Sequence, residues 1–438
     1  MAILNKEEAK AILQKIINLS KAESVEANFG GYKGGNIRYA RNTVTTAGEE
    51  TNTSISVTSN YGKKSGSASI NEFDDAALER VVRRSEELAQ FSPENSEFMP
   101  PMEAQEFKDS ISFKQSTADI TPEDRTKIAE SSIGPAKAGG VIAAGFEEDY
   151  NGFNAMMNSN GLYAYNRSTS MDFTVTMRSE DGTGSGYALH DYNDISKLDA
   201  AAASERAIKK AVDSQNAKAI EPGKYTVILE PAAASGLIGN MMWNLSARRA
   251  DEGRSFMSKK GGGTKLGEQI VDERVNIYQD PFNEANPSRT WTGSGLPVEK
   301  MDWIKGGAVE NLPYGRFWAK EKGVQPKPFS GRFIMDGGNA SIEDMIKDTK
   351  RGILVTRLWY IRSVDPQTLL YTGLTRDGTF FIENGKIQYP VKNFRFNESP
   401  VIMLNNLETL GKQYRVDGDM IPVMKIRDFT FSSLSDAV

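Results

Sequence analysis

Hydrophobic positions in the first 220 residues change from a helical to a strand-like period and back again. A first helix is predicted from Asn5 to Lys21, with Asn5 and Glu8 as a capping-box pair. Its apolar face is expected to hold Ile12, Leu13, Ile16 and Ile17. Residues 24–70 then alternate as strands do, with turns predicted at Gly30-Gly31, Gly34-Gly35 and Asn60-Tyr61-Gly62. Asp74-Asp75 caps a second helix whose apolar face comprises Ala77, Leu78, Val81, Val82 and Leu88.

The same order of elements returns after a polar, proline-containing linker, residues 92–118. Thr121-Pro122 opens a helix, and strands are expected from Gly140 to about His190. Asp194 is expected to begin another helix with Leu198, Ala202, Ile208, Ala211 and Val212 inside. Asn42 then corresponds to Asn160, and Gly66-Ser67 to Gly184-Ser185. We interpret this as an internal duplication of residues 5–91 and 121–214 within one N-terminal domain, residues 1–220.

A β-rich second half, residues 221–438, is predicted from Glu221-Pro222-Gly223 onward. A strand over Tyr225–Leu229 precedes a helix opened by Glu230-Pro231, with an apolar stripe of Leu237, Ile238, Met241, Met242 and Leu245. Further strands are expected at 270–278, 332–334, 353–361, 369–374, 378–383, 386–391 and 392–396. Short helices are expected at 341–351 and 403–410, and Asn384-Gly385 indicates a type I′ hairpin.

These patterns predict an α+β protein. The N-terminal domain would be a duplicated helix–β-meander–helix unit, and the C-terminal domain a β-rich barrel or sandwich.

Composition narrows the class of protein. The chain has 438 residues, of which 39% are hydrophobic and 25% charged, as in an ordinary globular protein. A net charge of −5 argues against a nucleic-acid surface, and no apolar run is long enough to span a bilayer. The charged residues Lys6 to Lys10 interrupt any signal-peptide core, so a cytoplasmic location is expected.

Two residue types that carry much enzyme chemistry are scarce. The chain has no cysteine, which excludes thiol nucleophiles and cysteine-ligated zinc. It has one histidine, His190, which excludes a metal site with two histidine ligands. A Ser-His-Asp triad would need His190, which stands beside Asp191. A surface or packing role is favoured over a general base, because no nucleophile elbow is present.

Charged residues concentrate between Ser246 and Ser255, after the apolar helix. Arg248, Arg249 and Arg254 stand beside Asp251 and Glu252. They could be ordinary ion pairs at a helix end, a clamp for carboxylates or a peptide backbone, or an acid/base or hard-cation site. Farther along, Tyr360 and Arg362 should share one strand face, with Trp359 on the other. That strand could line a peptide groove or be an ordinary sheet surface.

Three segments carry a resemblance to a known family. They are residues 249–255 (RADEGRS, with KLGE at 265–268), 372–378 (TGLTRDG) and 381–386 (FIENGK, followed by Pro390-Val391). Over essentially the whole chain, the sequence resembles the TldD/PmbA family, described as modulators of DNA gyrase and as peptide-processing metalloproteases. The resemblance implies a zinc helix with the motif HExxxH, two of whose side chains bind the metal and one of which activates water.

At the matching position this chain has Gly239, Asn240 and Asn244. Glycine has no side chain, asparagine is a poor zinc ligand, and an amide cannot take a proton from water. The resemblance is therefore to the metal-less, PmbA/TldE-like branch of the family. That branch implies a dimer with a HExxxH-bearing partner and no cofactor in this chain.

Three functional hypotheses follow from these observations. The first is a non-catalytic subunit that holds unfolded or extended peptides for a zinc-bearing partner. The second is a self-sufficient hydrolase that uses carboxylates near residues 249–255, and the third a homodimeric peptide-binding protein without turnover. Candidate peptide-binding residues are Arg249, Asp251, Glu252, Arg254, Tyr360 and Arg362. No nucleic-acid or membrane partner is expected, so any effect on gyrase would be indirect.

Overall fold

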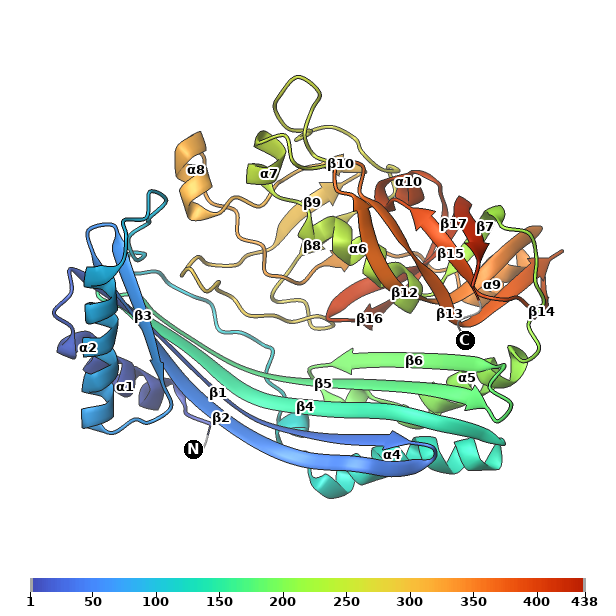
Figure 1. The fold of residues 1–438 in the computed structure, drawn as a ribbon, viewed down its shortest axis with the longest axis horizontal. Coiled ribbons are helices and arrows are strands. Elements are labelled where there is room, and N and C mark those ends of the chain that lie inside the picture. The colour runs from blue at the N-terminus through green and yellow to red at the C-terminus, as the bar shows by residue number, and fades with distance from the viewer. Residues whose placement is uncertain (1–2, 436–438) are drawn as a thin grey trace.

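A six-stranded antiparallel sheet organises the first half of the chain (Figure 1). The computed structural model describes residues 3–435. The strand order is β3-β2-β1-β4-β5-β6, and β1 joins the two meanders by pairing with β4 from Glu26–Asn158 to Tyr39–Gly145. The strands are β1 (Ser24–Ala40), β2 (Thr43–Tyr61), β3 (Lys64–Ile70), β4 (Val141–Asn158), β5 (Tyr163–Ser179) and β6 (Ser185–Tyr192).

Two pairs of helices cover one face of this sheet. The helices are α1 (Lys6–Leu19), α2 (Asp75–Phe91), α4 (Pro122–Ala138) and α5 (Ala200–Asp213). The first pair packs on Phe29 and the second on Ile37, which are both odd-numbered positions of β1 and therefore point to the same side. Capping by Asn5, Asp74 and Thr121 is confirmed, with capping boxes at Asn5 and Thr121.

The last helix of this half differs from the prediction at its start and on its buried face. Asp194 caps only a short 3₁₀ turn, Ile195–Lys197, and Asp199 caps α5. Small residues of α5 face the sheet, and the larger Val212 is 45% exposed. The reason is close approach: a Cβ at Gly186 of β6 would lie 2.0 Å from the carbonyl oxygen of Ala207.

The paired glycines near the start of the chain do not form turns, so that prediction is wrong. Gly30-Gly31 and Gly34-Gly35 lie inside β1, whereas the turn at Gly62 is confirmed, with a φ of 57°. Other side chains cross the strand where β1 lacks Cβ atoms. A Cβ on Gly35 would lie 2.0 Å from the guanidinium of Arg125, and one on Gly31 2.8 Å from the ring of Phe153. Glycine here provides space within a strand rather than a change of chain direction.

The second half contains an eleven-stranded sheet, part of which closes on itself (Figure 1). The pairs β7–β12, β12–β13, β13–β15, β15–β17 and β17–β7 form a ring, so the β-rich, barrel-like expectation is confirmed. Its strands are β7 (Gly223–Leu229), β8 (Ile277–Gln279), β9 (Met301–Lys305), β10 (Ala308–Val309), β11 (Ile334–Met335), β12 (Arg351–Asp365), β13 (Leu370–Glu383), β14 (Lys386–Pro390), β15 (Phe394–Glu398), β16 (Leu407–Val416) and β17 (Asp419–Leu434). The helices are α6 (Pro231–Trp243), α7 (Ala247–Asp251), α8 (Arg316–Lys322), α9 (Ile342–Lys347) and α10 (Pro400–Asn405).

Several predicted boundaries in this half are wrong. The strand expected over 270–278 shrinks to Ile277–Gln279, and the helix expected over 403–410 ends at Asn405 before β16 begins. The strands expected at 369–374 and 378–383 are one strand, β13, because Asp377 and Gly378 continue it with positive φ angles of 59° and 111°. The Asn384-Gly385 turn is confirmed, with φ angles of 50° and 75°.

Polar contacts join the two sheets. Arg415 of β16 donates to Asp191 at 2.9 Å and to Asn193 at 2.6 Å, all three side chains being buried. The linker, residues 92–118, includes α3 (Gln115–Ala118) and also crosses to the second half, where Thr290 donates to the carbonyl oxygen of Lys108 at 2.7 Å. The domain division near residue 220 stays a prediction. No helix among residues 3–435 is both long and apolar enough to cross a membrane.

One buried carboxyl in the first sheet has no hydrogen-bond partner among the described residues. Glu147 of β4 is fully buried, and both its oxygens lack a partner. Burial, and next the charge of Asp149, raises the pKa of Glu147 to about 8, although Arg125 opposes this shift. The Glu147 side chain is therefore largely neutral in the folded protein at pH 7.

We predict that Glu147 makes the folded state less stable as pH rises from about 4.5 to about 8. In that window the unfolded chain releases this proton and the folded chain keeps it, so stability falls by at most ~1.4 kcal/mol per pH unit. Glu147→Gln mimics the neutral form and should remove this part of the slope. Urea unfolding at several pH values measures it, with the exposed Glu130→Gln as control. An unchanged slope in Glu147→Gln would contradict the assignment.

Candidate functional site

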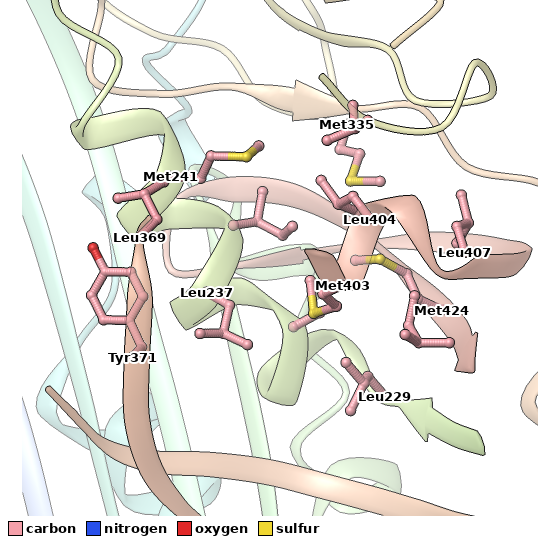
Figure 2. Close-up of a cluster of buried hydrophobic side chains, with 14 of the residues drawn as sticks. Leu229, Leu237, Met241, Met335, Leu369, Tyr371, Met403, Leu404, Leu407 and Met424 are labelled. Atoms are coloured by element: carbon pink, nitrogen blue, oxygen red, sulfur yellow. The ribbon is translucent and has the colours of Figure 1, made fainter. Parts of the chain in front are cut away.

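Helix α6 lies in the core of the second half, against the barrel strands. Its predicted apolar stripe is confirmed, because Leu237, Ile238, Met241, Met242 and Leu245 are all buried. Figure 2 shows Leu237 and Met241 within a cluster to which Leu229, Met403 and Met424 also belong. Packing of this face holds the helix against the barrel strands.

The polar positions of α6 are occupied by local hydrogen bonds. Asn240 donates to the carbonyl oxygen of Gly236 at 2.6 Å, and Asn244 donates to that of Asn240 at 2.8 Å. Asn244 also donates to the hydroxyl of Tyr371 at 3.2 Å. Gly239 offers no side-chain atom, although a Cβ there would meet nothing within 4 Å.

These residues do not fit the zinc ion that the family motif implies. An asparagine side chain whose amide is already bonded to the backbone offers only a weak neutral oxygen ligand, and zinc sites in proteins use imidazole, thiolate and carboxylate. Across residues 3–435, no three His, Cys, Asp or Glu side chains gather in a group that could hold a metal ion. We derive no metal-dependent step for this chain.

Most of the charge cluster from Arg248 to Arg254 forms one chain of ion pairs, from which Asp251 is separate. Arg248 makes a two-pronged contact with Glu97, at 2.7 and 2.6 Å, and also bonds Glu252. Glu252 also pairs with Arg254. The hydrogen bond from Arg254, and next that from Arg248, lowers the pKa of Glu252. Asp251 faces away, accepting from the indole of Trp318 at 2.8 Å.

One member of the charge cluster reaches α6. Arg249 donates to the side-chain oxygen of Asn244 at 3.2 Å, which places its guanidinium beside the position of the family motif. The structure therefore brings Arg249 and Asn244 together and separates Asp251 and Glu252. Two adjacent carboxylates with different ionic partners do not form an acid/base pair around one substrate atom.

An exposed aromatic and cationic surface lies on β12. The guanidinium of Arg362 lies 4.4 Å from the ring centroid of Tyr360, so these two residues share a face as expected. Trp359 does not point cleanly to the opposite face, because its ring lies 5.4 Å from that of Tyr360. A bulge between Trp359 and Arg362, with Tyr360 at a φ of 56°, breaks the alternation.

The same part of β12 leaves a strand edge unpaired. The pairing with β7 covers only Gly352 to Val355, and beyond it β13 is the one strand partner within residues 3–435. Ile361 packs against α6, since a Cβ on Gly236 would lie 2.6 Å from its Cδ1. Tyr360 and Arg362 are the neighbours of Ile361 in sequence, on the part of β12 whose second edge has no strand partner in the described residues.

His190 is engaged in a way that opposes a role as general base. Its Nε2 lies 2.7 Å from the guanidinium of Arg206 and its Nδ1 3.2 Å from the hydroxyl of Tyr192. Burial, together with the charge of Arg206, lowers the pKa of His190 to about 4. A neutral imidazole that accepts a hydrogen bond from Arg206 has little basicity left for a substrate.

Three partners of these residues were not predicted from the sequence. Glu97 accepts from Arg248, and Trp318 donates to Asp251, each from a distant part of the chain. Tyr371 of β13 accepts from Asn244. No local pattern marks them. The only features that could have pointed to them are the charge of Glu97 in the linker and the aromatic ring of Trp318 in the short helix α8.

Comparisons with known proteins match the chain in three segments. The family models are described as PmbA/TldA metallopeptidase domain 1, over residues 25–89, the central domain, over 116–215, and the C-terminal domain, over 222–433. A protein named metalloprotease from Methanothermobacter thermautotrophicus is 21% identical over 355 residues, which cover 72% of this chain and 74% of that protein. The metalloprotease PmbA of Escherichia coli O157:H7 is 25% identical over 215 residues, 46% of each chain.

Solved structures share the fold. TldE from Thermococcus kodakarensis has a TM-score of 0.87 at 17% identity, covering 96% of this chain and all of that one. A proposed modulator of a DNA gyrase from Thermotoga maritima also has a TM-score of 0.87, at 16% identity, covering 97% of this chain and all of that one. With the family models matching in sequence order between residues 25 and 433, the chain belongs to the TldD/PmbA family of metalloprotease-related proteins.

Proposed function

We propose that this chain is a non-catalytic subunit of a cytoplasmic proteolytic complex, in which it holds unfolded peptides for a HExxxH-bearing family member. The observation that carries the proposal is the state of α6. One face of the helix is buried in the core, yet Gly239, Asn240 and Asn244 stand where the family motif would supply zinc ligands and a base. The scaffold of a metallopeptidase is retained without groups that could do its chemistry.

The unpaired edge of β12 supports the peptide-holding part of the proposal. An extended peptide can add a strand to such an edge and form main-chain hydrogen bonds that do not depend on its sequence. Tyr360 and Arg362 beside that edge offer an aromatic face and a cation, and Arg249 lies at the end of α6. A peptide bound there would run past the α6 helix.

The two alternatives have less support in the geometry. A hydrolase built on Asp251 and Glu252 would need them to converge, and each is committed to different partners. A homodimeric binding protein without a protease partner would use the same β12 edge. It differs from the main proposal only in that this chain would not raise the turnover of a HExxxH subunit added to it.

The direct test is peptide turnover by the purified chain, alone and mixed with a HExxxH-bearing family member. We expect no turnover of a fluorogenic unfolded-protein substrate by the chain alone. The mixture should exceed the activity of the partner alone, because this subunit presents the peptide. Chelator-sensitive turnover by the isolated chain would overturn the proposal. A mixture no more active than the partner alone would favour the homodimeric alternative.

Carboxylate substitutions separate the proposal from the hydrolase hypothesis. Asp251→Asn and Glu252→Gln should leave the turnover of the mixture within about twofold, because both carboxylates bond to side chains of this chain and neither acts on substrate. Glu79→Gln, an exposed position on α2, is the matched control. A loss of turnover by orders of magnitude in either variant, with its melting temperature unchanged, would instead assign catalysis to these carboxylates.

A further inference from the structure

A groove separate from the β12 edge lies between the linker and α8. Its volume is about 670 Å³, within the usual range of ligand sites. Apolar side chains from both walls line it, including Met99, Met102, Leu296, Met301 and Val324. Methionine side chains adapt to differently shaped apolar groups, so such a lining suits varied peptide side chains.

Two cations of α8 line the same groove. Arg316 is half-buried and donates to the carbonyl oxygen of Pro100, but it forms no ion pair among the described residues. Lys320 is exposed one helical turn later, also without an ion pair in residues 3–435. Glu299, at the exposed rim, is the one acidic residue in the lining. The α8 wall is therefore positive while the remainder is largely apolar.

Arg316 has donor capacity left for an incoming anion. Burial lowers the pKa of Arg316, and the charge of Glu26 across a second cavity of about 320 Å³ opposes that shift. A guanidinium has five N–H donors, and one carbonyl leaves several of them for a ligand. A carboxylate placed there would receive charge-assisted hydrogen bonds in a partly desolvated position.

The groove also ends beside the family-motif helix. Pro328 lines it, and the next residue, Phe329, packs edge-on against Trp243 with ring centroids 5.6 Å apart. Trp243 is the last residue of α6 and is 66% exposed. A molecule held in the groove would thus have one end close to α6.

We propose that this groove binds the C-terminal end of a peptide, with the terminal carboxylate on Arg316 and Lys320 and the last apolar side chain among Met99, Met102 and Leu296. The inference rests on the proposed peptide-holding function and specifies which end of the peptide is recognised. Apolar lining selects the side chain, and the two cations select a free carboxylate over an internal peptide bond. An internal segment would leave both cations unpaired.

Fluorescence anisotropy on the full chain tests the proposal with two matched probes. One is a fluorescein-labelled short peptide that ends in leucine with a free carboxylate, and the other is its C-terminal amide. The wild type should bind the carboxylate form about 10-fold more tightly than the amide, because one charge-assisted hydrogen bond contributes roughly that much to the affinity. Arg316→Gln and Lys320→Gln should each weaken the carboxylate form toward the amide and leave the amide unchanged. Arg80→Gln, an exposed arginine of α2 paired with Glu72, is the control.

The outcomes separate this proposal from the function on which it rests. Equal binding of the two probes by the wild type would overturn the groove assignment, as would full discrimination retained in both variants. Lys320→Gln keeps the test informative if Arg316→Gln unfolds, since Lys320 makes no ion pair in the described part of the chain. Turnover in the partner mixture despite equal probe binding would refute the groove alone. Discriminating binding without any turnover would refute the proteolytic role alone.

Discussion

Burial of one face of α6 is the constraint on which the second half of the molecule depends. Leu237, Ile238 and Met241 are fully buried against the barrel strands, and removing a side chain of this kind from a core typically costs about 2–5 kcal/mol. Folding of this half therefore depends on the buried face of the helix, whether or not its other face carries metal ligands. The asparagines at that face meet a local need, since their amides donate to main-chain oxygens of the same helix. A metallopeptidase scaffold can in this way persist without a metal site.

The proposed peptide-holding role rests on the surfaces around α6. The edge of β12 beyond Val355 has no strand partner among residues 3–435, and Arg362 lies beside it at the surface. An acid that contacts α6 is Asp417, which accepts a hydrogen bond from Ser235 and whose pKa burial raises. The strongly shifted groups lie elsewhere: Glu147 is inside the first sheet, and Asp419, whose pKa burial raises to about 7, lies where the two halves meet near Asp191. Those groups bear on folding and on the junction of the two halves. Among residues 3–435, no group of three or more His, Asp and Glu side chains at α6 or elsewhere could hold a metal ion.

Local patterns in the sequence were sufficient to predict much of the fold, but they predicted few of the contacts in the candidate site. Capping residues such as Asn5 and Thr121 act on their own helices, so their roles could be predicted from neighbouring residues. The glycines of β1 were predicted as turns, because the side chains that need the space at these positions, Arg125 and Phe153, are far away in the sequence. The partners of the charge cluster were missed for the same reason, since Glu97 and Arg248 are 151 positions apart. The bulge at Tyr360 is a register shift that a period-two pattern does not contain.

The measurement that tests the central claim most directly uses the assembled complex with the partner's catalytic glutamate removed. With glutamine in place of glutamate in the partner's HExxxH motif, this chain would be the only subunit able to act. Our account predicts that peptide turnover by the complex then falls to the uncatalysed background, while peptide binding by this chain persists. Chelator-sensitive turnover that survives the substitution would contradict it, and would assign a catalytic centre to this chain.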